Sequence, residues 1–580
     1  MIVLTAILVF SIGFTAVPNV KASPATYREA FLATADFLKS DMAGTGHFSD
    51  YVAGSNEMPE YYAWAGLVLL RAYQLTGDNS YLNEALAVAN FLKTKIDELA
   101  PTLQASGLTT GAVKWVYPGW TSTIAATGQA KCIIFLIELY KETGTVQYRN
   151  MAKGMADFLV KEMRYRSQAA VNGGTDADGK FTELSTNNGA LVGGYAIDLK
   201  PDGSDVYDYN ILTYVNGDVL WALKLIDQQV GGYSTYVTAL ADQLSLMTAT
   251  MPSKGWTVNL NNKANPDDDA YTAMSASPGD KYAVRAVIAA LGLMMAGRMG
   301  QANTILDWAV NQQSGGKIYS CTYIRANSMA AIAMLYAGRV EAVHTLNWIR
   351  DQQLTGGKFP KQERGSWTGH TDDYISTAYA ALALYEGQKM FVDSKTEKTG
   401  SGDYTVDAKA EADTEVDKKG DGTPTVTVVK YTSNPGGALP LSALGKYIDV
   451  RIDSSVGVTE IVIKVYYTDD EVAAAGLDEN TLMLFWWNGA EWVACSEQSR
   501  DTVNNYIRAS IRSDTKPSLN DLVGTPFGAG GRAPAPPPPK YSYPVGGILT
   551  PINKLVILTP YLALIGLVAL VTVAVKKRKH

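Results

Sequence analysis

The sequence has few of the residues that build disulfide frameworks and metal centres. Its 580 residues include 3 cysteines and 4 histidines, which are Cys132, Cys321, Cys495, His47, His344, His370 and His580. The cysteines are too few and too widely spaced for a disulfide framework or a cysteine-rich zinc site. The histidines lack the paired spacing of zinc-binding helices. We therefore expect neither a disulfide-stabilised fold nor a metal centre built from histidine and cysteine.

The chain also has fewer basic than acidic residues. Lysine and arginine number 50 against 57 aspartates and glutamates, which gives a formal net charge of −7. Binding to nucleic acid depends on a positive field that displaces phosphate counterions, so the composition argues against a nucleic-acid partner. The hydrophobic fraction of 47% and the charged fraction of 18% are ordinary for a globular protein. They exclude a disordered, collagenous or wholly membrane-embedded chain.

Two apolar runs lie at the ends of the sequence. Residues 2–17 are too short to span a bilayer and precede the small residues Val20 and Ala22, which predicts a signal peptide at 1–22. Residues 555–575 are 21 uncharged residues, long enough for a transmembrane helix across about 30 Å of hydrocarbon. The basic tail at 576–580 places that end in the cytoplasm. We therefore expect a single-pass type I protein of the cell membrane, largely extracellular, with a Gly/Pro-rich stalk at 528–550.

Helical periodicity dominates the chain up to about residue 390. Segments with one apolar face alternate with segments that are apolar nearly all round. The first set is predicted at about 25–41, 79–97, 146–163, 233–250, 299–313 and 340–353, and the second at about 59–76, 121–143, 213–228, 280–297, 323–337 and 371–387. A helix that is apolar on all sides must be buried, so the alternation predicts two concentric layers. Residues 23–392 are therefore predicted to form an (α/α)6 toroid of six helical hairpins, with long loops at one rim.

Several of these segments resemble known toroids. YYAWAGLVLLRAYQLTGDNSYLNEALAVANFL and TGQAKCIIFLIELYKETGTVQYRNMAKGMADFL resemble the hairpins of six-hairpin glycosidases and of related lyases and sugar epimerases. GWTSTIAATGQA and YVNGDVLWALKLID are similar to the helical domain of glucuronyl C5-epimerases. LDWAVNQQSGGKIYS and LNWIRDQQLTGGKFP instead resemble the repeats of terpene (squalene) cyclase and protein prenyltransferase toroids. These resemblances imply one architecture and leave its chemistry open.

Aromatic and cationic residues gather in the predicted long loops and at the adjoining helix starts. Aromatic rings stack on the C–H faces of sugars, and arginine and lysine hold acidic groups. Packing between helix ends is the alternative role for any one of these rings. The residues expected to bind substrate are Tyr61, Trp64, Trp115, Trp120, Tyr209, Tyr214, Arg325, Lys361, Arg364 and Trp367.

Carboxylates in the same region supply candidate catalytic groups. Glycoside hydrolysis uses one protonated and one ionised carboxyl group, and lyases and epimerases move a proton next to a sugar carboxylate. The candidate catalytic residues are Glu60, Asp218, His370, Asp372 and Asp373. Asp372 and Asp373 stand at a predicted helix start, where capping of free N–H groups is the alternative role. The sequence does not select among hydrolysis, elimination and epimerisation.

No cofactor is predicted, although calcium is left open. Asp176, Asp178 and Glu183 in one loop, and Asp417 with Asp421 in another, space oxygen ligands as calcium loops do. Neither loop completes an EF-hand pattern, so no residue is assigned as a metal ligand.

Alternating β-branched and aromatic residues follow a polar segment at 393–422, which we expect to be a linker. An Asn-Gly turn within WWNGAEWVAC indicates a hairpin, and residues 423–527 are predicted to form a β-sandwich-like domain. The string VYYTDDEVAAAGLDENTLMLFWWNGAEWVACSEQSRDTVNNYIRASI resembles a domain that precedes the membrane anchor of archaeal, especially methanogen, surface proteins. That resemblance implies a role in spacing and presentation.

The sequence thus predicts a cell-surface carbohydrate-active protein, either a glycoside hydrolase or a uronate-directed lyase or epimerase acting on extracellular polysaccharide. A noncatalytic toroid that binds glycans or a protein is the second hypothesis. The third is a toroid of the terpene cyclase or prenyltransferase type, for which TDDYISTA matches the Asp-rich acid motif only in part. The oligomeric state is left unassigned.

Overall fold

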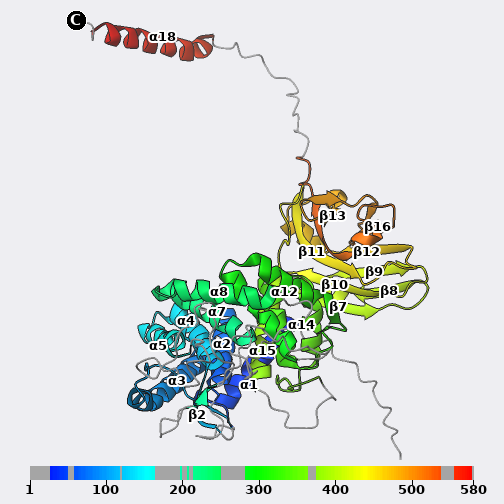
Figure 1. Cartoon of the computed structure of the whole chain (residues 1–580). Coiled ribbons are helices and arrows are strands. Elements are labelled where there is room, and N and C mark those ends of the chain that lie inside the picture. The colour runs from blue at the N-terminus through cyan, green and yellow to red at the C-terminus, as the bar shows by residue number, and fades with distance from the viewer. Residues whose placement is uncertain are drawn as a thin grey trace, which may run out of the picture. The chain divides into compact units, whose positions relative to one another are not determined.

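A computed structural model describes most of the chain. The described residues are 26–49, 58–117, 120–163, 196–198, 206–207, 213–249, 281–363, 374–536 and 554–577. The chain divides into two compact units, residues 1–532 and 533–580. Helices predominate in the first part of unit 1 and strands in the rest, as the blue-to-green and yellow-to-orange ribbons of Figure 1 show. The predicted order of a mainly helical region followed by a β region is confirmed.

Six inner helical segments form a ring in the described part of the chain. They are α2 (Pro59–Thr76), α4 (Ala126–Thr143), α7 (Thr213–Val230), the broken helix α10 (Lys281–Arg285), η1 (Ala286–Ile288) and α11 (Ala289–Met295), α13 (Ile324–Tyr336) and α15 (Tyr374–Met390). Each contacts the next in this order, and α15 contacts α2, so the ring closes.

Six outer helices surround that ring in the same part of the chain. They are α1 (Tyr27–Met42), α3 (Asn79–Ala105), α5 (Val146–Glu162), α8 (Ser234–Ala249), α12 (Met299–Asn311) and α14 (Ala342–Asp351). Burial explains the two layers. Every residue of α4 from Ala126 to Ile137 is buried, whereas α5 buries one face, including Tyr148, Ala152 and Met155.

The connections set the direction of the inner helices. Two-residue turns join α2 to α3 and α4 to α5, and Gly77 and Gly144 take left-handed conformations there, with φ of 73° and 69°. The segments that lead from an outer helix to the next inner helix are far longer, for example 312–323 and 352–373. Each outer helix runs back along its inner partner, so all six inner helices begin at the long-loop rim.

A glutamine from each of the repeat segments LDWAVNQQSGGKIYS and LNWIRDQQLTGGKFP connects outer elements of the ring. Gln353 Nε2 donates to Ala30 O at 2.7 Å and to Thr34 Oγ1 at 2.9 Å, which joins the segment after α14 to α1. Gln313 makes the same kind of contact with the start of α14. Gly357 packs directly on α1, where a Cβ would lie 2.2 Å from Ala33 O. The second repeat therefore closes the outer layer between its last and first helices.

The helical part of the chain also contains short strands, and the β region also contains short helices. Near the ring lie β1 (Trp115–Tyr117), β2 (Trp120–Ala125), β3 (Ala196–Asp198), β4 (Val206–Tyr207), β5 (Gln313–Ser314) and β6 (Lys317–Ile318). The β region contains the short helices α16 (Lys409–Ala412), α17 (Asp469–Ala474), η2 (Glu479–Thr481) and η3 (Leu519–Asp521).

The β region has two antiparallel sheets. The first has the order β14 (Trp492–Ala494), β13 (Met483–Trp487), β17 (Val523–Gly531), β11 (Ser442–Ile452), β10 (Thr425–Tyr431) and β7 (Phe391–Lys398). The second has the order β15 (Gln498–Asp501), β16 (Tyr506–Ile511), β12 (Glu460–Tyr466), β9 (Thr414–Lys419) and β8 (Tyr404–Ala408). Val428, Ile448 and Ile463 are among the buried residues of both sheets that form one core between them.

The segment 393–422, expected to be a polar linker, is part of this β region. Helix α15 ends at Met390 and β7 begins at Phe391, so no linker separates the ring from the first sheet. Strand β9 alternates buried and half-buried residues, with Val416 on the buried side. The charged residues between the buried ones lie on the outer face, which is why the composition resembles a linker.

The first sheet also packs on the helices with its second face. Phe391, Val429, Tyr431, Tyr447 and Trp492 belong to the same buried cluster as the ring helices. Tyr27 of α1 reinforces the junction, because its hydroxyl bonds Ser394 Oγ of β7 at 2.7 Å. Ring and β region therefore form one compact unit rather than two independently packed domains.

The second unit contains α18 (Lys554–Lys577), which coincides with the predicted membrane span at 555–575. Its described side chains, 558–571, are exposed. Across the residues that the structure describes, no helix combines the length and apolar character that crossing a membrane requires. The predicted signal peptide at 1–22 lies outside the described residues, as does most of the stalk at 528–550.

Candidate functional site

Polar residues occupy the first turns of every inner helix. Because these helices all begin at the long-loop rim, their first turns face a common region around the ring axis. Charged side chains rarely occupy fully buried positions unless they are paired or functional. The polar residues concerned are Glu60, Thr127, Lys131, Asn216, Asp218, Arg285, Arg325, Ser328, Ser376 and Tyr379, of which all but the half-buried Arg325 are buried.

An ion pair joins two neighbouring inner helices at this centre. Lys131 Nζ of α4 lies 3.2 Å from Asp218 Oδ2 of α7, and both side chains are 0% exposed. The Lys131 ammonium also donates to Thr127 Oγ1. Glu60 and Arg325 are close enough for their charges to act on Lys131. Three inner helices, α2, α4 and α7, thus place two carboxyl groups around one lysine.

Burial governs the protonation of this pair. It raises the pKa of Asp218, and the nearby charges of Lys131 and Arg325 offset only part of that rise. Burial likewise lowers the pKa of Lys131, against the attraction of Asp218. Both directions favour the uncharged forms over the charged ones. Asp218 is therefore equipped to hold and donate a proton, which is the property that a general acid needs.

Two aromatic side chains lie against the pair. The rings of Trp64 and Tyr379 meet edge to face with centroids 5.6 Å apart. Lys131 Nζ and Arg325 Cζ lie 5.6 Å and 5.5 Å from the Tyr379 ring centre. Burial, followed by the charge of Asp218, raises the pKa of Tyr379 well above its ordinary value. Tyr379 is therefore a neutral phenol, which can donate a hydrogen bond but cannot act as a phenolate base near neutral pH.

Several buried polar atoms at the centre make no hydrogen bond of good geometry with the protein. Among them are Trp64 Nε1, Tyr379 Oη, Ser328 Oγ and both carboxyl oxygens of Asp218, on residues no more than 1% exposed. Trp64 lies close enough to Tyr379 to act on the pKa of the phenol, but the contact lacks hydrogen-bond geometry. Nearly all buried polar atoms in proteins are hydrogen-bonded, so each exception needs an explanation. Leaving one unmade costs about 1–3 kcal/mol. A molecule rich in hydroxyl groups supplies both the donors and the acceptors that would satisfy them.

The structure brings several of the predicted site residues together. Glu60, Trp64, Asp218 and Arg325 surround Lys131 and Tyr379 at the ring centre. For three other predicted binding residues the structure shows packing or backbone contacts. Tyr61 is half-buried against the core, and Arg285 Cζ lies 5.9 Å from the centre of the Tyr214 ring. The carbonyl oxygen of Lys361 accepts a hydrogen bond from the N–H of Ile324, the first residue of α13.

The other predicted residues are not placed by the structure. Tyr209, Arg364, Trp367, His370, Asp372 and Asp373 lie outside the described residues. Trp115 lies in β1 and Trp120 in β2, and only the backbone of these two residues is described.

Lys131 and Tyr379 are central residues that the sequence patterns did not single out. Lys131 interrupts the apolar run of a helix expected to be buried on all sides, and such a charge is the signal that could have identified it. Tyr379 carries no comparable signal, because tyrosine is common in buried helices.

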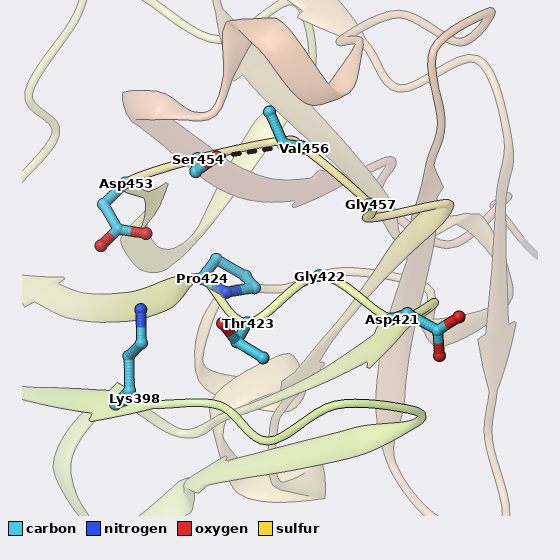
Figure 2. A pocket seen from close by; sticks show the side chains of 9 residues that line it. All are labelled: Lys398, Asp421, Gly422, Thr423, Pro424, Asp453, Ser454, Val456 and Gly457. Carbon is cyan, nitrogen blue, oxygen red and sulfur yellow. Dashed lines mark hydrogen bonds between the residues drawn. The ribbon is translucent and has the colours of Figure 1, made fainter.

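Metal ligands do not gather in the described part of the chain. No group of three or more His, Cys, Asp or Glu residues there is arranged to hold a metal ion. Cys132, Cys321 and Cys495 are buried free thiols. The calcium-type residues Asp176, Asp178 and Glu183 lie outside the described residues. Asp417 lies in strand β9 of the β region, and Asp421 lines a surface depression of about 510 Å³ that Figure 2 shows.

Comparison with known proteins finds similarity in structure alone. No family model and no curated protein matches the sequence. An unsaturated glucuronyl hydrolase from Bacillus sp. GL1 and a D-mannose isomerase each share 13% identity over 63% of this chain and 97% of theirs, with a TM-score of 0.44. A family 76 glycoside hydrolase from a bovine Bacteroides thetaiotaomicron strain shares 13% identity over 62% of this chain and 68% of its own, with a TM-score of 0.31.

Proposed function

We propose that the protein is carbohydrate-active and takes a polysaccharide or oligosaccharide into the long-loop rim of its helical ring. The observation that carries this proposal is the set of buried, unsatisfied polar atoms of Trp64, Tyr379 and Ser328 around the Lys131–Asp218 pair. Sugar hydroxyl groups match such mixed donors and acceptors, and aromatic edges and faces match sugar C–H groups.

The charge balance at the centre favours an acidic sugar. Arg285 and Arg325 bring two positive charges against the one negative charge of Glu60, and the Lys131–Asp218 pair adds no net charge whether both partners are ionised or both are neutral. The starts of the surrounding inner helices add partial positive charge at the same rim. A sugar carboxylate would neutralise the excess positive charge and would form charge-assisted hydrogen bonds with the guanidinium groups.

Two carboxyl groups in this setting support hydrolysis of a glycosidic bond. Asp218, whose pKa burial raises, is the candidate acid that protonates the leaving oxygen. Glu60 is the candidate second carboxylate, acting as base or nucleophile. The same residues would also serve elimination or epimerisation next to a uronate carboxylate, with the cations stabilising the charge that develops there.

Noncatalytic glycan binding is the second candidate function. The observation that favours it is the complete burial of both partners of the Lys131–Asp218 pair, which suits a fixed framework as well as a reactive group. An isoprenoid-processing toroid is disfavoured, because its substrate requires an apolar cavity and the described ring centre is polar.

The experiment incubates the full chain with a panel of neutral and uronate-containing polysaccharides. Reducing ends report hydrolysis, unsaturated products report elimination, and exchange of a sugar C–H in heavy water reports epimerisation. We expect one of these signals, and expect Asp218→Asn to abolish it. Asp97→Asn, which changes an exposed carboxylate of α3, is the matched control. Binding without any product would favour the noncatalytic candidate, and neither product nor binding would overturn the proposal.

The predicted export of the chain remains part of this proposal, because an extracellular polysaccharide requires it. Fractionation of cells that express the full chain tests it. Recovery of the protein in the cytosolic fraction would contradict it.

A further inference from the structure

Strand β9 carries a lysine where an apolar residue is expected. Thr414, Val416 and Lys418 are the buried residues of its alternating pattern, and they point into the interior of the sandwich. Lys418 is 0% exposed and ranks among the largest fully buried side chains described. A lysine at an inward position demands a compensating set of acceptors, because a buried ammonium without them is very costly.

Four backbone carbonyl groups surround the Lys418 ammonium. Its Nζ donates to Gly400 O at 2.9 Å, to Gly420 O at 2.8 Å and to Gly422 O at 2.8 Å, and it also donates to Gly402 O. An alkylammonium group has three N–H donors, so four acceptors must share them. The arrangement therefore resembles the shell of carbonyl oxygens around a spherical cation more than a set of paired hydrogen bonds.

We propose that these four carbonyl groups form a binding site for a monovalent cation, and that Lys418 occupies it as a built-in cation. The carbonyls come from two turns, one between β7 and β8 and one after β9, so the ammonium ties the two turns together. Removal of the lysine head group leaves a site that a free ammonium-type or potassium-sized cation fills.

We call the four carbonyl groups of Gly400, Gly402, Gly420 and Gly422 the carbonyl cage. The chemistry of this cage favours a monovalent over a divalent ion. Calcium sites combine carboxylates with carbonyl groups, and the four oxygens here are all neutral. Asp417, which precedes Lys418, points to the outer face, where its Oδ2 pairs with Lys464 Nζ at 2.9 Å and its Oδ1 accepts from Thr405 Oγ1. Asp421, between Gly420 and Gly422, has an exposed side chain. The calcium-like spacing of Asp417 and Asp421 therefore marks a loop whose central cation is the ammonium of Lys418.

The cage also supports the surface depression of Figure 2. Gly422, whose carbonyl accepts from Lys418, lines that depression between Asp421 and Thr423. Its N–H donates to Gly457 O at 2.8 Å, which fixes the opposite wall. Gly420 has φ of 98°, and a Cβ there would lie 2.5 Å from Gly457 O, so the turn accepts glycine alone. The Lys418 ammonium thus bonds a turn whose backbone conformation depends on glycine at position 420.

Two variants of the full chain test the proposal by chemical rescue. Lys418→Ala lacks the side chain beyond Cβ, which propylammonium replaces, and Lys418→Met keeps an apolar stem and leaves room for ammonium. We expect both variants to lose several degrees of thermal stability in sodium chloride. The loss should be largely recovered by propylammonium for the first and by ammonium for the second, with tetramethylammonium inactive at equal ionic strength.

Controls separate a cation site from general salt effects. Lys398→Met removes an exposed lysine at the edge of the same depression, and we expect no cation-specific response from it. If a Lys418 variant does not fold in sodium chloride, refolding yield in each salt replaces thermal stability as the measurement. Rubidium scattering at the cage in crystals of Lys418→Met would support the site. Equal behaviour in ammonium, sodium and tetramethylammonium salts would overturn it.

Discussion

Asp449 offers a prediction whose size can be worked out from its surroundings. It lies in β11 at the junction with the helices, is 2% exposed and accepts a hydrogen bond from Tyr431 Oη at 3.1 Å. Burial raises its pKa to about 7, although Tyr431 and Arg451 act in the opposite direction, and Glu341 adds to the rise. The substitution Asp449→Asn would imitate the protonated carboxyl group with an amide that does not titrate.

The direction in which stability changes with pH follows from the raised pKa of Asp449. Below pH 4 the carboxyl group is protonated in both the folded and the unfolded chain, so the stabilisation from proton binding is fully present. Between pH 4 and about 7 the unfolded chain releases the proton while the folded chain keeps it, and stability falls. A shift from 3.8 to about 7 corresponds to about 4 kcal/mol at about 1.4 kcal/mol per pH unit.

The assay is denaturant unfolding of the full chain, followed by tryptophan fluorescence from pH 4 to 8.5. We expect the stability of Asp449→Asn relative to the natural chain to rise by about 4 kcal/mol across this range and to level off above pH 7.5. Asp470→Asn, at an exposed position of α17, should show no such trend. Parallel pH profiles of the natural chain and Asp449→Asn would refute the reasoning.

Two further predictions concern the ring. Gln353→Ala should lower the free energy of unfolding by about 1–2 kcal/mol, because it removes two hydrogen bonds to α1, whereas Gln301→Ala on the exposed side of α12 should not; equal effects in denaturant unfolding would contradict the ring-closing role. Lys131→Met should raise the pKa of Asp218 further and should destabilise the chain by about 3–5 kcal/mol where that carboxyl group is ionised, with a smaller loss at low pH. The infrared band of a protonated carboxyl group, followed against pH, should persist to higher pH in this variant, and an unchanged titration would contradict the prediction.

The helices can be predicted because their buried, apolar residues recur in the sequence with the period of an α-helix. The segment 59–76 is predicted with the bounds that α2 has, since its apolar residues cover the whole helix and Gly77 ends it. The strands from β7 to β9 are not predicted from the sequence. Charged residues on their outer face hide the alternation of buried and half-buried residues that β9 shows. An exposed strand face and a linker have the same composition, and only the partner sheet distinguishes them.

The candidate site is predictable in part for a similar reason. Glu60 and Asp218 stand out as acidic residues at the starts of apolar helices, and the structure brings both into the neighbourhood of Lys131. Trp64, predicted to bind substrate, also lies at the centre, through its contact with Tyr379. Which residues from different helices meet around one axis depends on ring closure, and that information is absent from local periodicity.

The central claim is that the buried polar centre of the ring binds a sugar. The most direct measurement is the affinity of the full chain for a glycan array containing neutral and uronate oligosaccharides, compared with Trp64→Phe. This substitution keeps an aromatic ring and removes Nε1, one of the unsatisfied donors. We predict binding of a uronate-containing glycan and a loss of about tenfold in Trp64→Phe, as one lost hydrogen bond implies, with no loss in Trp487→Phe of the β region. Absence of glycan binding, or equal binding by both variants, would contradict the claim.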